Sequence, residues 1–581
     1  MQLAQQHRLS ELTVESGDGS VRLRRAGRRQ AKSQPHITST HRRTEEIRAP
    51  LIGVFYRSPA PDAPPYVRVG DWIESDQTIG LIEAMKVFNE ITSEVAGRVA
   101  ALPVANGELV EAGQILVAVE LEERNRPRGG GRGGARGRAD ARIDCGGQPN
   151  GMARDVIRIG ILGFGKVGGG AYQVLEENAD SIALKVGSRL EIARVADIDW
   201  QRPREVDLPQ EKRATDARAV IEDPAIDIIV ETIGGTDPAL GFVLAALRAG
   251  KCVVTSNKEL IAKHGREILE EADARGLDIY FEGAVGGGIP IIQPLKQSLA
   301  ANRIASIVGI VNGTTNYILT QMASGGGDFA HALAEAQRKG YAEPDPTDDI
   351  EGNDAAYKLA ILASIAFNSR AAIDQIYREG ISRIAPADMV YARELGFVVK
   401  LLAIGRDRGD AVELRVHPAF LPQSHPLAAV SDVFNAIFVE GSAAGRLMFY
   451  GRGAGARPTG SAVVGDIIEV ARNINHGARG RVPCTCFAER PVKPMDEVVT
   501  KHYVRMQVAD RPGVLAKIAA VFGDEGVSLA SVVQKAASGG GAEIVWVTHE
   551  SLERAVRRSL DRIRALPEVN EISNWVRVEE G

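Results

Sequence analysis

The sequence predicts a multidomain protein: a small all-β domain, a doubly wound α/β domain that continues into an α+β region, and a final α+β domain. Three observations predict it. Residues 44–121 contain an internal repeat of short alternating segments. The glycine-rich turn GFGKVG, at residues 163–168, separates an apolar strand pattern from a helical pattern. Residues 500–581 alternate strand and helix patterns in the order βαββαβ.

Length and composition agree with several ordinary domains. At 581 residues, the chain is too long for one core, and ~100–200 residues per domain predicts three to five domains. The apolar fraction of 44% and the charged fraction of 25% are those of a soluble protein. A net charge of −5 favours neither a nucleic-acid partner nor a membrane surface. Without a signal-peptide core or an apolar run of ~18 residues, the expected location is the cytoplasm.

The cysteines predict neither a disulfide framework nor a metal site. The chain has four, namely Cys145, Cys252, Cys484 and Cys486. Cys484 and Cys486 form a CxC pair, but no second Cys or His cluster lies nearby. We therefore expect reduced thiols.

Two polar segments predict linkers. Residues 1–43 form an N-terminal arm whose second half is polar, and residues 122–151 are rich in arginine and glycine with almost nothing to bury. Such a segment cannot offset its ordering entropy, so we expect a flexible tether. Its RGGGRGG portion faintly resembles an RNA-binding box, but no aromatic residues interleave with the arginines.

The first domain, residues 44–121, is built from the repeat. Residues 69–83 match residues 106–120, with Gly70 opposite Gly107 and Glu83 opposite Glu120. Short strands repeated once predict two interlocked sheets related by a pseudo-twofold axis. Lys86 then falls in a tight turn that joins the two repeats.

This domain resembles the hammerhead-like biotinyl domain, specifically the biotin carboxyl carrier protein of acetyl-CoA carboxylase. The resemblance rests on EAMKV around Lys86, on the thumb-like YRSPAPDAPPY at residues 56–66, and on residues 9–25. It implies covalent biotin on Lys86, attached by biotin ligase, with biotin carboxylase and carboxyltransferase as further partners. A lipoyl group is the less favoured alternative.

The next domain, residues 152–290, has the pattern of a Rossmann fold. Gly163 permits the tight turn, Gly165 lets backbone approach a pyrophosphate, and Gly168 lets the helix pack closely. The helix N-terminus then faces the phosphates. Further strands are predicted at residues 190–197, 225–234, 251–256 and 277–283.

The choice between NAD and NADP stays open from the sequence. Asp197 ends the second strand, where a carboxylate can bond the ribose 2′-hydroxyl. Arg202 and Arg204 follow within reach of a 2′-phosphate, although an exposed loop explains them equally well.

A chemical site is predicted where acids and lysines gather. Asp354 and Lys358 are one helical turn apart and share a face. Lys258 directly follows a predicted strand, at the sheet edge where such folds bind ligands. Glycine-rich turns at residues 281–292 and 311–319 permit close backbone approach. The alternative interpretation is a solvated acidic loop that leads into a helix.

Residues 152–490 resemble homoserine dehydrogenase. The motifs GFGKVG, TSNKELIA, EGAVGGGIP, NGTTNYI and GYAEPDPTDDIEGNDAAYK occur in that family's order. The resemblance implies interconversion of L-homoserine and L-aspartate 4-semialdehyde with NAD or NADP, in threonine, methionine and isoleucine biosynthesis. It also implies a catalytic and dimerisation domain at residues 291–490, with 450–490 returning to the Rossmann domain, and a homo-oligomer, dimer or tetramer.

The same resemblance implies residue roles. Lys358 is the proton donor, Lys258 lies near nicotinamide and substrate, and Asp354 and Glu343 hold the substrate's amino group beside Gly340. A possible sodium ion is bound by Glu282 with the backbone carbonyls of Val285, Gly287 and Ile289. The implied cofactor-binding residues are Gly163, Phe164, Gly165, Lys166, Val167, Gly168, Asp197, Thr232, Lys258 and Gly453. The chemistry agrees, because hydride transfer at an alcohol carbon needs a proton partner and a stabilised alkoxide charge.

Residues 500–581 resemble an ACT domain, a module that binds amino acids at strand–helix turns. The resemblance implies an effector site at Asp510, Gly513 and Val514, and the alternative is a dimerisation module without a ligand. Many ACT domains carry Asn where this chain has Ser528, so the effector stays open between threonine and another amino acid.

The leading hypothesis is a homoserine dehydrogenase fused behind a biotin carrier. One alternative makes the carrier the principal part, as the biotin subunit of acetyl-CoA carboxylase, but the sequence contains no carboxylase or carboxyltransferase pattern to complete that reaction. Another is an amino-acid sensor on an inert scaffold, which the apparently full set of Lys258, Glu343, Asp354 and Lys358 disfavours. Met152 has the character of a start, so production as one native polypeptide is a separate question.

Overall fold

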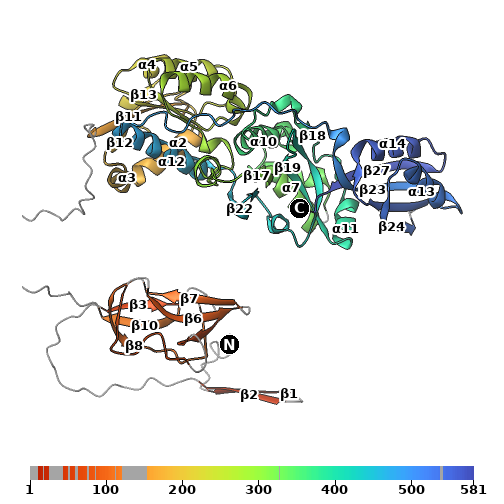
Figure 1. Ribbon diagram of the computed structural model, residues 1–581, viewed down its shortest axis with the longest axis horizontal. Coiled ribbons are helices and arrows are strands. Elements are labelled where there is room, and N and C mark those ends of the chain that lie inside the picture. The colour runs from red at the N-terminus through yellow and green to blue at the C-terminus, as the bar shows by residue number, and fades with distance from the viewer. Residues whose placement is uncertain are drawn as a thin grey trace, which may run out of the picture. The chain divides into compact units, whose positions relative to one another are not determined.

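A computed structural model describes most of the chain in two compact units, Met1–Asp144 and Cys145–Gly581 (Figure 1). The described residues are 11–16, 19–24, 44–49, 53–58, 63–74, 77–84, 87–93, 95–111, 113–120, 154–325, 327–536 and 541–580. Lys86 and the predicted linker 122–151 lie outside them, so both of those predictions stay predictions.

The first unit contains two four-stranded antiparallel sheets, in the orders β3-β10-β8-β5 and β7-β6-β4-β9, and a separate β1-β2 hairpin. Its strands are β1 (Glu11–Ser16), β2 (Gly19–Arg24), β3 (Thr44–Arg48), β4 (Gly53–Tyr56), β5 (Trp72–Ile73), β6 (Thr78–Ala84), β7 (Val87–Thr92), β8 (Gly97–Ala101), β9 (Glu108–Val110) and β10 (Ile115–Glu120). The repeat partners β6 and β10 lie in different sheets, as do β5 and β9. This exchange confirms the predicted pair of interlocked sheets.

The core of this unit is apolar, and one hairpin frames the predicted biotin lysine. Phe55, Ile73 and Leu116 are fully buried between the sheets. Strands β6 and β7 pair up to Ala84 opposite Val87, on either side of Lys86 in the sequence.

The second unit begins with a six-stranded parallel sheet in the order β13-β12-β11-β14-β15-β16. Its strands are β11 (Val156–Leu162), β12 (Arg189–Ala196), β13 (Arg213–Ala214), β14 (Ile228–Glu231), β15 (Cys252–Thr255) and β16 (Ile279–Tyr280). Its helices are α2 (Lys166–Glu177), α3 (Ala179–Val186), α4 (Ala217–Glu222), α5 (Ala239–Arg248) and α6 (Lys258–Arg275). This order is that of a doubly wound dinucleotide-binding sheet, as predicted. Strand β16 is shorter than predicted because the chain turns into a 3-10 helix at Glu282–Ala284.

The chain returns to this sheet through helix α12 (Ala456–Asn475), which packs against α2 (Figure 1). Glycine makes the approach close: a Cβ on Gly170 would lie 2.0 Å from the carbonyl oxygen of Ala456. The last helix of the catalytic region therefore belongs to the packing of the nucleotide-binding sheet.

The catalytic region places helices α7 and α10 against an antiparallel sheet (Figure 1). Its strands are β17 (Ile304–Ile310), β18 (Tyr377–Arg378), β19 (Phe397–Asp407), β20 (Val412–Pro422), β21 (Phe434–Gly441) and β22 (Gly445–Arg452). Its helices are α7 (Gly313–Gly325), α8 (Phe329–Arg338), α9 (Thr347–Ile350), α10 (Asn353–Ala366) and α11 (Pro386–Glu394). Helix α10 is buried along most of its length, so polar residues on it are held firmly.

The final region has the predicted βαββαβ order. Its elements are β23 (Val499–Ala509), α13 (Val514–Asp524), β24 (Leu529–Ala536), β25 (Gly541–Thr548), the short β26 (Ser551–Leu552), α14 (Glu553–Arg564) and β27 (Val569–Val578). Strand β27 also pairs in parallel with β20, where Ala419 faces Arg577 and Phe420 faces Val578. One eleven-stranded sheet therefore runs through both regions, in the order β22-β21-β17-β19-β20-β27-β23-β25-β24, with β18 paired to β20 and β26 paired to β23 off this path.

Buried charges line the seam between β20 and β27. Arg415 is fully buried and pairs with Glu413 (2.7 Å) and with Glu579. Arg577 is also buried and pairs with Glu553 (2.5 Å) and with Glu379. Because each arginine binds two carboxylates, the charges compensate one another inside the protein.

Within the described residues, every helix is too short or too polar to cross a membrane.

Candidate active site

A carboxylate held between two lysines is the centre of the candidate site. Lys358 Nζ lies 2.6 Å from Asp354 Oδ2, and Lys258 Nζ lies 2.5 Å from Asp354 Oδ1. The side chain of Asp354 is 4% exposed, that of Lys358 10% and that of Lys258 43%. The structure thus brings together the three residues predicted as catalytic, with Lys258 the one most open to solvent.

Each lysine reaches the site through a local feature of its helix. Asp354 and Lys358 lie one turn apart on α10, as their spacing predicts. Lys258 is the first residue of α6, three residues after the carboxyl end of β15. Asn257 caps this helix by accepting the N–H of Leu260 (3.0 Å), and its amide donates to the carbonyl oxygen of Gly235 (2.6 Å). The site therefore lies at the edge where doubly wound sheets bind ligands.

Electrostatics divide the roles of the two lysines. Burial lowers the pKa of Lys358 despite the adjacent Asp354, and the charge of Lys258 lowers it further. Asp354 raises the pKa of Lys258 against the effect of burial. Burial alone would raise the pKa of Asp354, but the two lysines outweigh it and hold that pKa below its ordinary value. Lys258 therefore favours its protonated, charged form, whereas Lys358 loses its proton more readily than Lys258 does.

The structure adds polar residues that the sequence analysis did not single out. The Asn312 amide donates to Asp354 Oδ2 (2.8 Å) and to Asp349 Oδ1 (2.7 Å), and Lys358 also donates to the carbonyl oxygen of Val311 (2.7 Å). Burial and the charge of Asp354 raise the pKa of Asp349. The available signal is the asparagine in NGTTNYI, a segment whose glycine and place in the chain predict only a turn.

Glu343 and Gly340 lie on the loop after α8. Glu343 is exposed, and its carbonyl oxygen accepts a hydrogen bond from the Gln337 side chain (3.1 Å). Among the described contacts, none joins its carboxylate to Lys258, Asp354 or Lys358. Gly340 has φ +74°, which suits the turn that ends the helix. Their substrate-binding role stays a prediction.

The glycine-rich turn has the geometry of a phosphate-binding loop. Gly163 has φ +92°, and a Cβ there would lie 2.9 Å from the backbone of Thr232, whose hydroxyl donates to the carbonyl oxygen of Gly163 (2.7 Å). A Cβ on Gly168 would lie 2.3 Å from that same carbonyl oxygen. Gly165, by contrast, faces open space, directly before Lys166 and Val167 begin α2. The turn therefore leaves its backbone and the helix N-terminus open to a pyrophosphate.

Asp197 directly follows the second strand, β12, one residue beyond the predicted placement at its end, and its carboxylate already accepts hydrogen bonds. It accepts the backbone N–H of Phe164 (2.8 Å) and of Asp199 (3.0 Å), and Arg204 lies 3.1 Å away. The Arg204 guanidinium lies over the ring of Trp200 at 4.7 Å. These contacts outweigh the effect of burial, which opposes them, and keep the pKa of Asp197 low.

The turn predicted to bind sodium is held together by Glu282. Its carboxylate accepts the backbone N–H groups of residues 291, 292 and 293, at 2.5, 2.8 and 2.7 Å. The side chain is thus occupied, so a cation there would rely on the carbonyl oxygens of Val285, Gly287 and Ile289. Gly453 lies against this turn, because a Cβ on Gly287 would come within 2.6 Å of its backbone. In the described part of the chain, no three His, Cys, Asp or Glu side chains form a metal-binding group.

The predicted effector turn begins helix α13. Gly513 caps the helix with φ +89°, and Val514, its first residue, is buried. Asp510 accepts a hydrogen bond from Gln534 at 3.4 Å. The turn has the expected place, and its ligand stays a prediction.

The parallel sheet, the open glycine turn and the lysine–aspartate–lysine trio define the class: a nicotinamide-dependent oxidoreductase. Comparisons with known proteins give the family. Family models match "Homoserine dehydrogenase, NAD binding domain" at residues 163–282 and "Homoserine dehydrogenase" at residues 290–468. Residues 502–568 match "ACT domain", and residues 45–119 match "Biotin-requiring enzyme".

Individual relatives agree. A homoserine dehydrogenase from Corynebacterium glutamicum is 47% identical and covers 73% of this chain and 96% of its own length. A homoserine dehydrogenase from Synechocystis is 46% identical and covers 73% of this chain and 99% of its own length. The crystal structure of a homoserine dehydrogenase from Thiobacillus denitrificans matches with a TM-score of 0.70. Its sequence is 42% identical, and the match covers 73% of this chain and 98% of that chain. The chain belongs to the homoserine dehydrogenase family and carries a biotinyl domain ahead of the enzyme.

Proposed function

We propose that the site transfers hydride reversibly between L-homoserine and L-aspartate 4-semialdehyde, with Lys358 as the proton-transfer residue. The buried pair of Lys358 and Asp354 carries the proposal. A nicotinamide cofactor, when bound, supplies the hydride acceptor and donor. The residues of this chain then have to orient the alcohol and move its proton.

In the oxidation direction, neutral Lys358 accepts the hydroxyl proton of the substrate. Its lowered pKa makes the neutral form accessible, and its bond to Asp354 fixes the position of Nζ. Lys258 keeps its charge and stabilises the alkoxide-like oxygen as the carbonyl forms. In the reduction direction, protonated Lys358 returns the proton.

Asp354 binds the substrate's ammonium group by giving up its contact with Lys258. Lys258 is the more exposed partner, so it is the lysine that can move toward the substrate oxygen. A carboxylate–ammonium contact in a buried site is a strong, charge-assisted interaction. Glu343, on its exposed loop, provides a second carboxylate when that loop approaches the substrate.

NADP is the cofactor that the loop after β12 favours. Arg204 neutralises Asp197, which would otherwise repel a 2′-phosphate, and Arg213 also stacks on Trp200, at 5.2 Å. We expect Arg204→Leu to lower kcat/KM for NADP about tenfold to a hundredfold, the effect of one charged hydrogen bond, and to change NAD kinetics less. Arg194→Leu, an exposed arginine on β12, is the matched control. Equal losses with both cofactors would contradict the preference.

Three finer assignments accompany this function. Sodium binds the carbonyl oxygens of the turn at residues 285–289. The enzyme is a dimer or tetramer, supported by the edge strand β22 with exposed Met448 and Tyr450. The turn at Asp510 and Gly513 binds an amino-acid effector. Titration of the activity with sodium tests the sodium site. Light scattering measures the oligomeric state. Inhibition by added amino acids tests the effector turn.

The first unit carries biotin on Lys86 and serves partner carboxylase enzymes as a carrier. The match to biotin-requiring enzymes and the interlocked sheets support this assignment. Biotin ligase attaches the group, and a biotin carboxylase and a carboxyltransferase would use it.

One assay tests the principal function. Purified protein should reduce NADP or NAD only when L-homoserine is present, and should oxidise the reduced cofactor only with L-aspartate 4-semialdehyde. Absence of homoserine-dependent absorbance at the nicotinamide band, in protein that still binds cofactor, would exclude the proposed reaction.

A further inference from the structure

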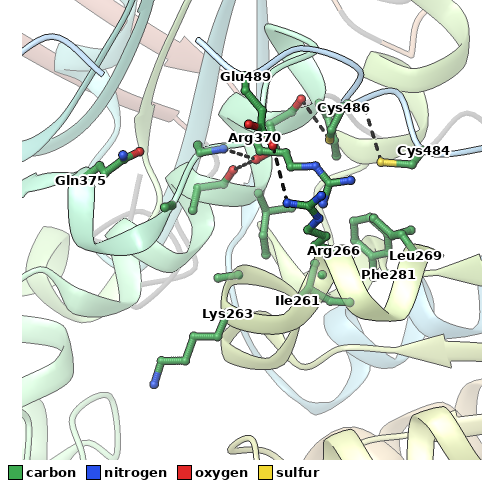
Figure 2. A pocket seen from close by; sticks show the side chains of 18 of the residues that line it. Ile261, Lys263, Arg266, Leu269, Phe281, Arg370, Gln375, Cys484, Cys486 and Glu489 are labelled. Carbon is green, nitrogen blue, oxygen red and sulfur yellow. Dashed lines mark hydrogen bonds and ion pairs between the residues drawn. The ribbon is translucent and has the colours of Figure 1, made fainter. Parts of the chain in front are cut away.

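A cavity of about 390 Å³ is lined by residues of helices α6 and α10 and of the segments around residues 370 and 484–490 (Figure 2). Ile261 and Leu269 of α6 and Ile361 of α10 form its apolar lining. The polar side chains of Arg266, Arg370, Gln375 and Glu489 also border it. None of Lys258, Asp354 and Lys358 lines the cavity, so it is separate from the trio.

Cys484 and Cys486 line this cavity together (Figure 2). Both side chains are half-buried, and the backbone N–H of Cys486 lies 3.4 Å from Cys484 Sγ. Cys486 Sγ lies 3.4 Å from the carbonyl oxygen of Ser364, in the last turn of α10. The Cα atoms of residues two apart along a chain are separated by at most ~7 Å, and a disulfide forms when that separation is below about 6.8 Å.

The surroundings favour a thiolate at Cys484. The adjacent Cys486 side chain lowers the pKa of Cys484, and the backbone N–H of Cys486 together with the charges of Lys296 and Arg370 add to this against the effect of burial. The adjacent Cys484 side chain, with burial, raises the pKa of Cys486. Arg266 and Arg370 share Glu270 as a partner, at 2.9 and 3.1 Å, so they are held in place beside the cavity. The two thiols therefore differ in acidity. Cys484 more readily forms the nucleophilic thiolate, and Cys486 more readily keeps its proton.

We propose that Cys484 and Cys486 form a redox dithiol that exchanges with a small disulfide of the glutathione type entering this cavity. The Cys484 thiolate attacks one sulfur of the small disulfide and releases one thiolate, which leaves a mixed disulfide on Cys484. Cys486 then loses its proton and attacks Cys484 Sγ, releasing the second small thiol. Two protein thiols are oxidised to one disulfide, and one small disulfide is reduced to two thiols.

Closure of the disulfide changes a contact at the end of α10. Cys486 can no longer donate a proton to the carbonyl oxygen of Ser364, because its sulfur no longer carries hydrogen. The first two turns of the same helix carry Asp354 and Lys358. The dithiol therefore touches the helix that holds the proton-transfer lysine.

The test is cysteine mapping of the full chain after incubation with glutathione disulfide and alkylation of the remaining thiols. Cys145→Ser is the background, so that only the cysteines of the second unit are compared. The wild-type pair should form a Cys484–Cys486 disulfide that dithiothreitol reverses. In the Cys486→Ser variant, a mixed disulfide with glutathione should accumulate at Cys484. In the Cys484→Ser variant, the mixed disulfide at Cys486 should form at least about tenfold more slowly.

Cys252 is the internal control. It is fully buried, and burial raises the pKa of its thiol to about 11, so it should stay unmodified while the protein is folded. Full alkylation of both Cys484 and Cys486 after incubation, or no mixed disulfide in Cys486→Ser, would overturn the proposal. Because the wild-type pair gives a result by itself, poor folding of a variant does not leave the question undecided.

Discussion

The two units of this chain differ in where their described residues place charge. In the first unit, the sheets enclose an apolar core, the described ion pair Arg48–Glu46 is exposed, and the predicted biotin lysine follows a hairpin strand. In the second unit, Lys358 is buried and bound to Asp354, inside a network that also includes Asn312. A carrier needs a stable frame that presents one side chain, whereas hydride transfer needs charges fixed in a low-dielectric site. The two lysines should therefore respond differently to the same kinds of change.

The largest expected effect is at the carrier lysine. Lys86→Arg should abolish biotin incorporation completely, because the ligase acylates one amine and arginine offers none. The homoserine-dependent rate should stay at the wild-type value. Intact mass after co-expression with biotin ligase checks the first outcome. A biotin-sized increment that persists in Lys86→Arg would show that another residue is modified.

The next effect is at the buried lysine. Lys358→Ala should lower kcat by about a hundredfold to ten-thousandfold, the usual contribution of a general acid or base. Cofactor affinity should stay unchanged, because the glycine turn at Gly163 is untouched. Steady-state kinetics and fluorescence titration measure the two quantities.

Lys263→Ala is the matched control for that experiment. This lysine lies on α6, is exposed, and pairs with Glu259 at 2.6 Å. It should leave kcat unchanged. If both substitutions lowered kcat equally, the assignment of proton transfer to Lys358 would fail.

The pH dependence gives a smaller, graded effect. Neutral Lys358 accepts the proton in homoserine oxidation, so kcat/KM should rise about tenfold per pH unit below the pKa of Lys358. Because burial lowers that pKa, the rise should level off below the value of about 10.4 for a free lysine. The reduction direction needs the protonated form, so its rate should fall above the same pKa. Parallel profiles in the two directions would contradict the role.

The smallest effect is expected on removing the first unit. A chain that lacks residues 1–150 should keep kcat and KM within about twofold of the full-length values, as for domains that fold separately. The relatives that match over 96–99% of their length cover only 73% of this chain, which supports this independence. A larger loss of activity, with the oligomeric state unchanged, would show that the carrier assists the enzyme.

Local patterns predicted what depends on local geometry. The repeat predicted the interlocked sheets, and the four-residue spacing of Asp354 and Lys358 predicted their shared face. The pairing of Lys258 with Asp354 joins two regions far apart in the sequence, and the ordered motifs of a family suggested only that both residues belong to one site. No periodicity indicates that Asn312 bridges Asp354 and Asp349, or that β20 pairs with β27. Such contacts depend on tertiary packing, which a propensity or a spacing does not encode.

The pairing of β20 with β27 has a consequence for how such proteins recombine. A βαββαβ module is often treated as a cassette that can be exchanged between enzymes, but here Arg577 and Glu579 compensate buried charges that include Arg415 of the catalytic region. A foreign module without a matching acid would leave Arg415 only partly compensated, and losing a partner of a buried ion pair costs about 3–5 kcal/mol. Recombined proteins that fold should therefore take β20 and β27 from the same parent. The segment that can be exchanged then extends beyond the domain boundary that the sequence predicts near residue 500.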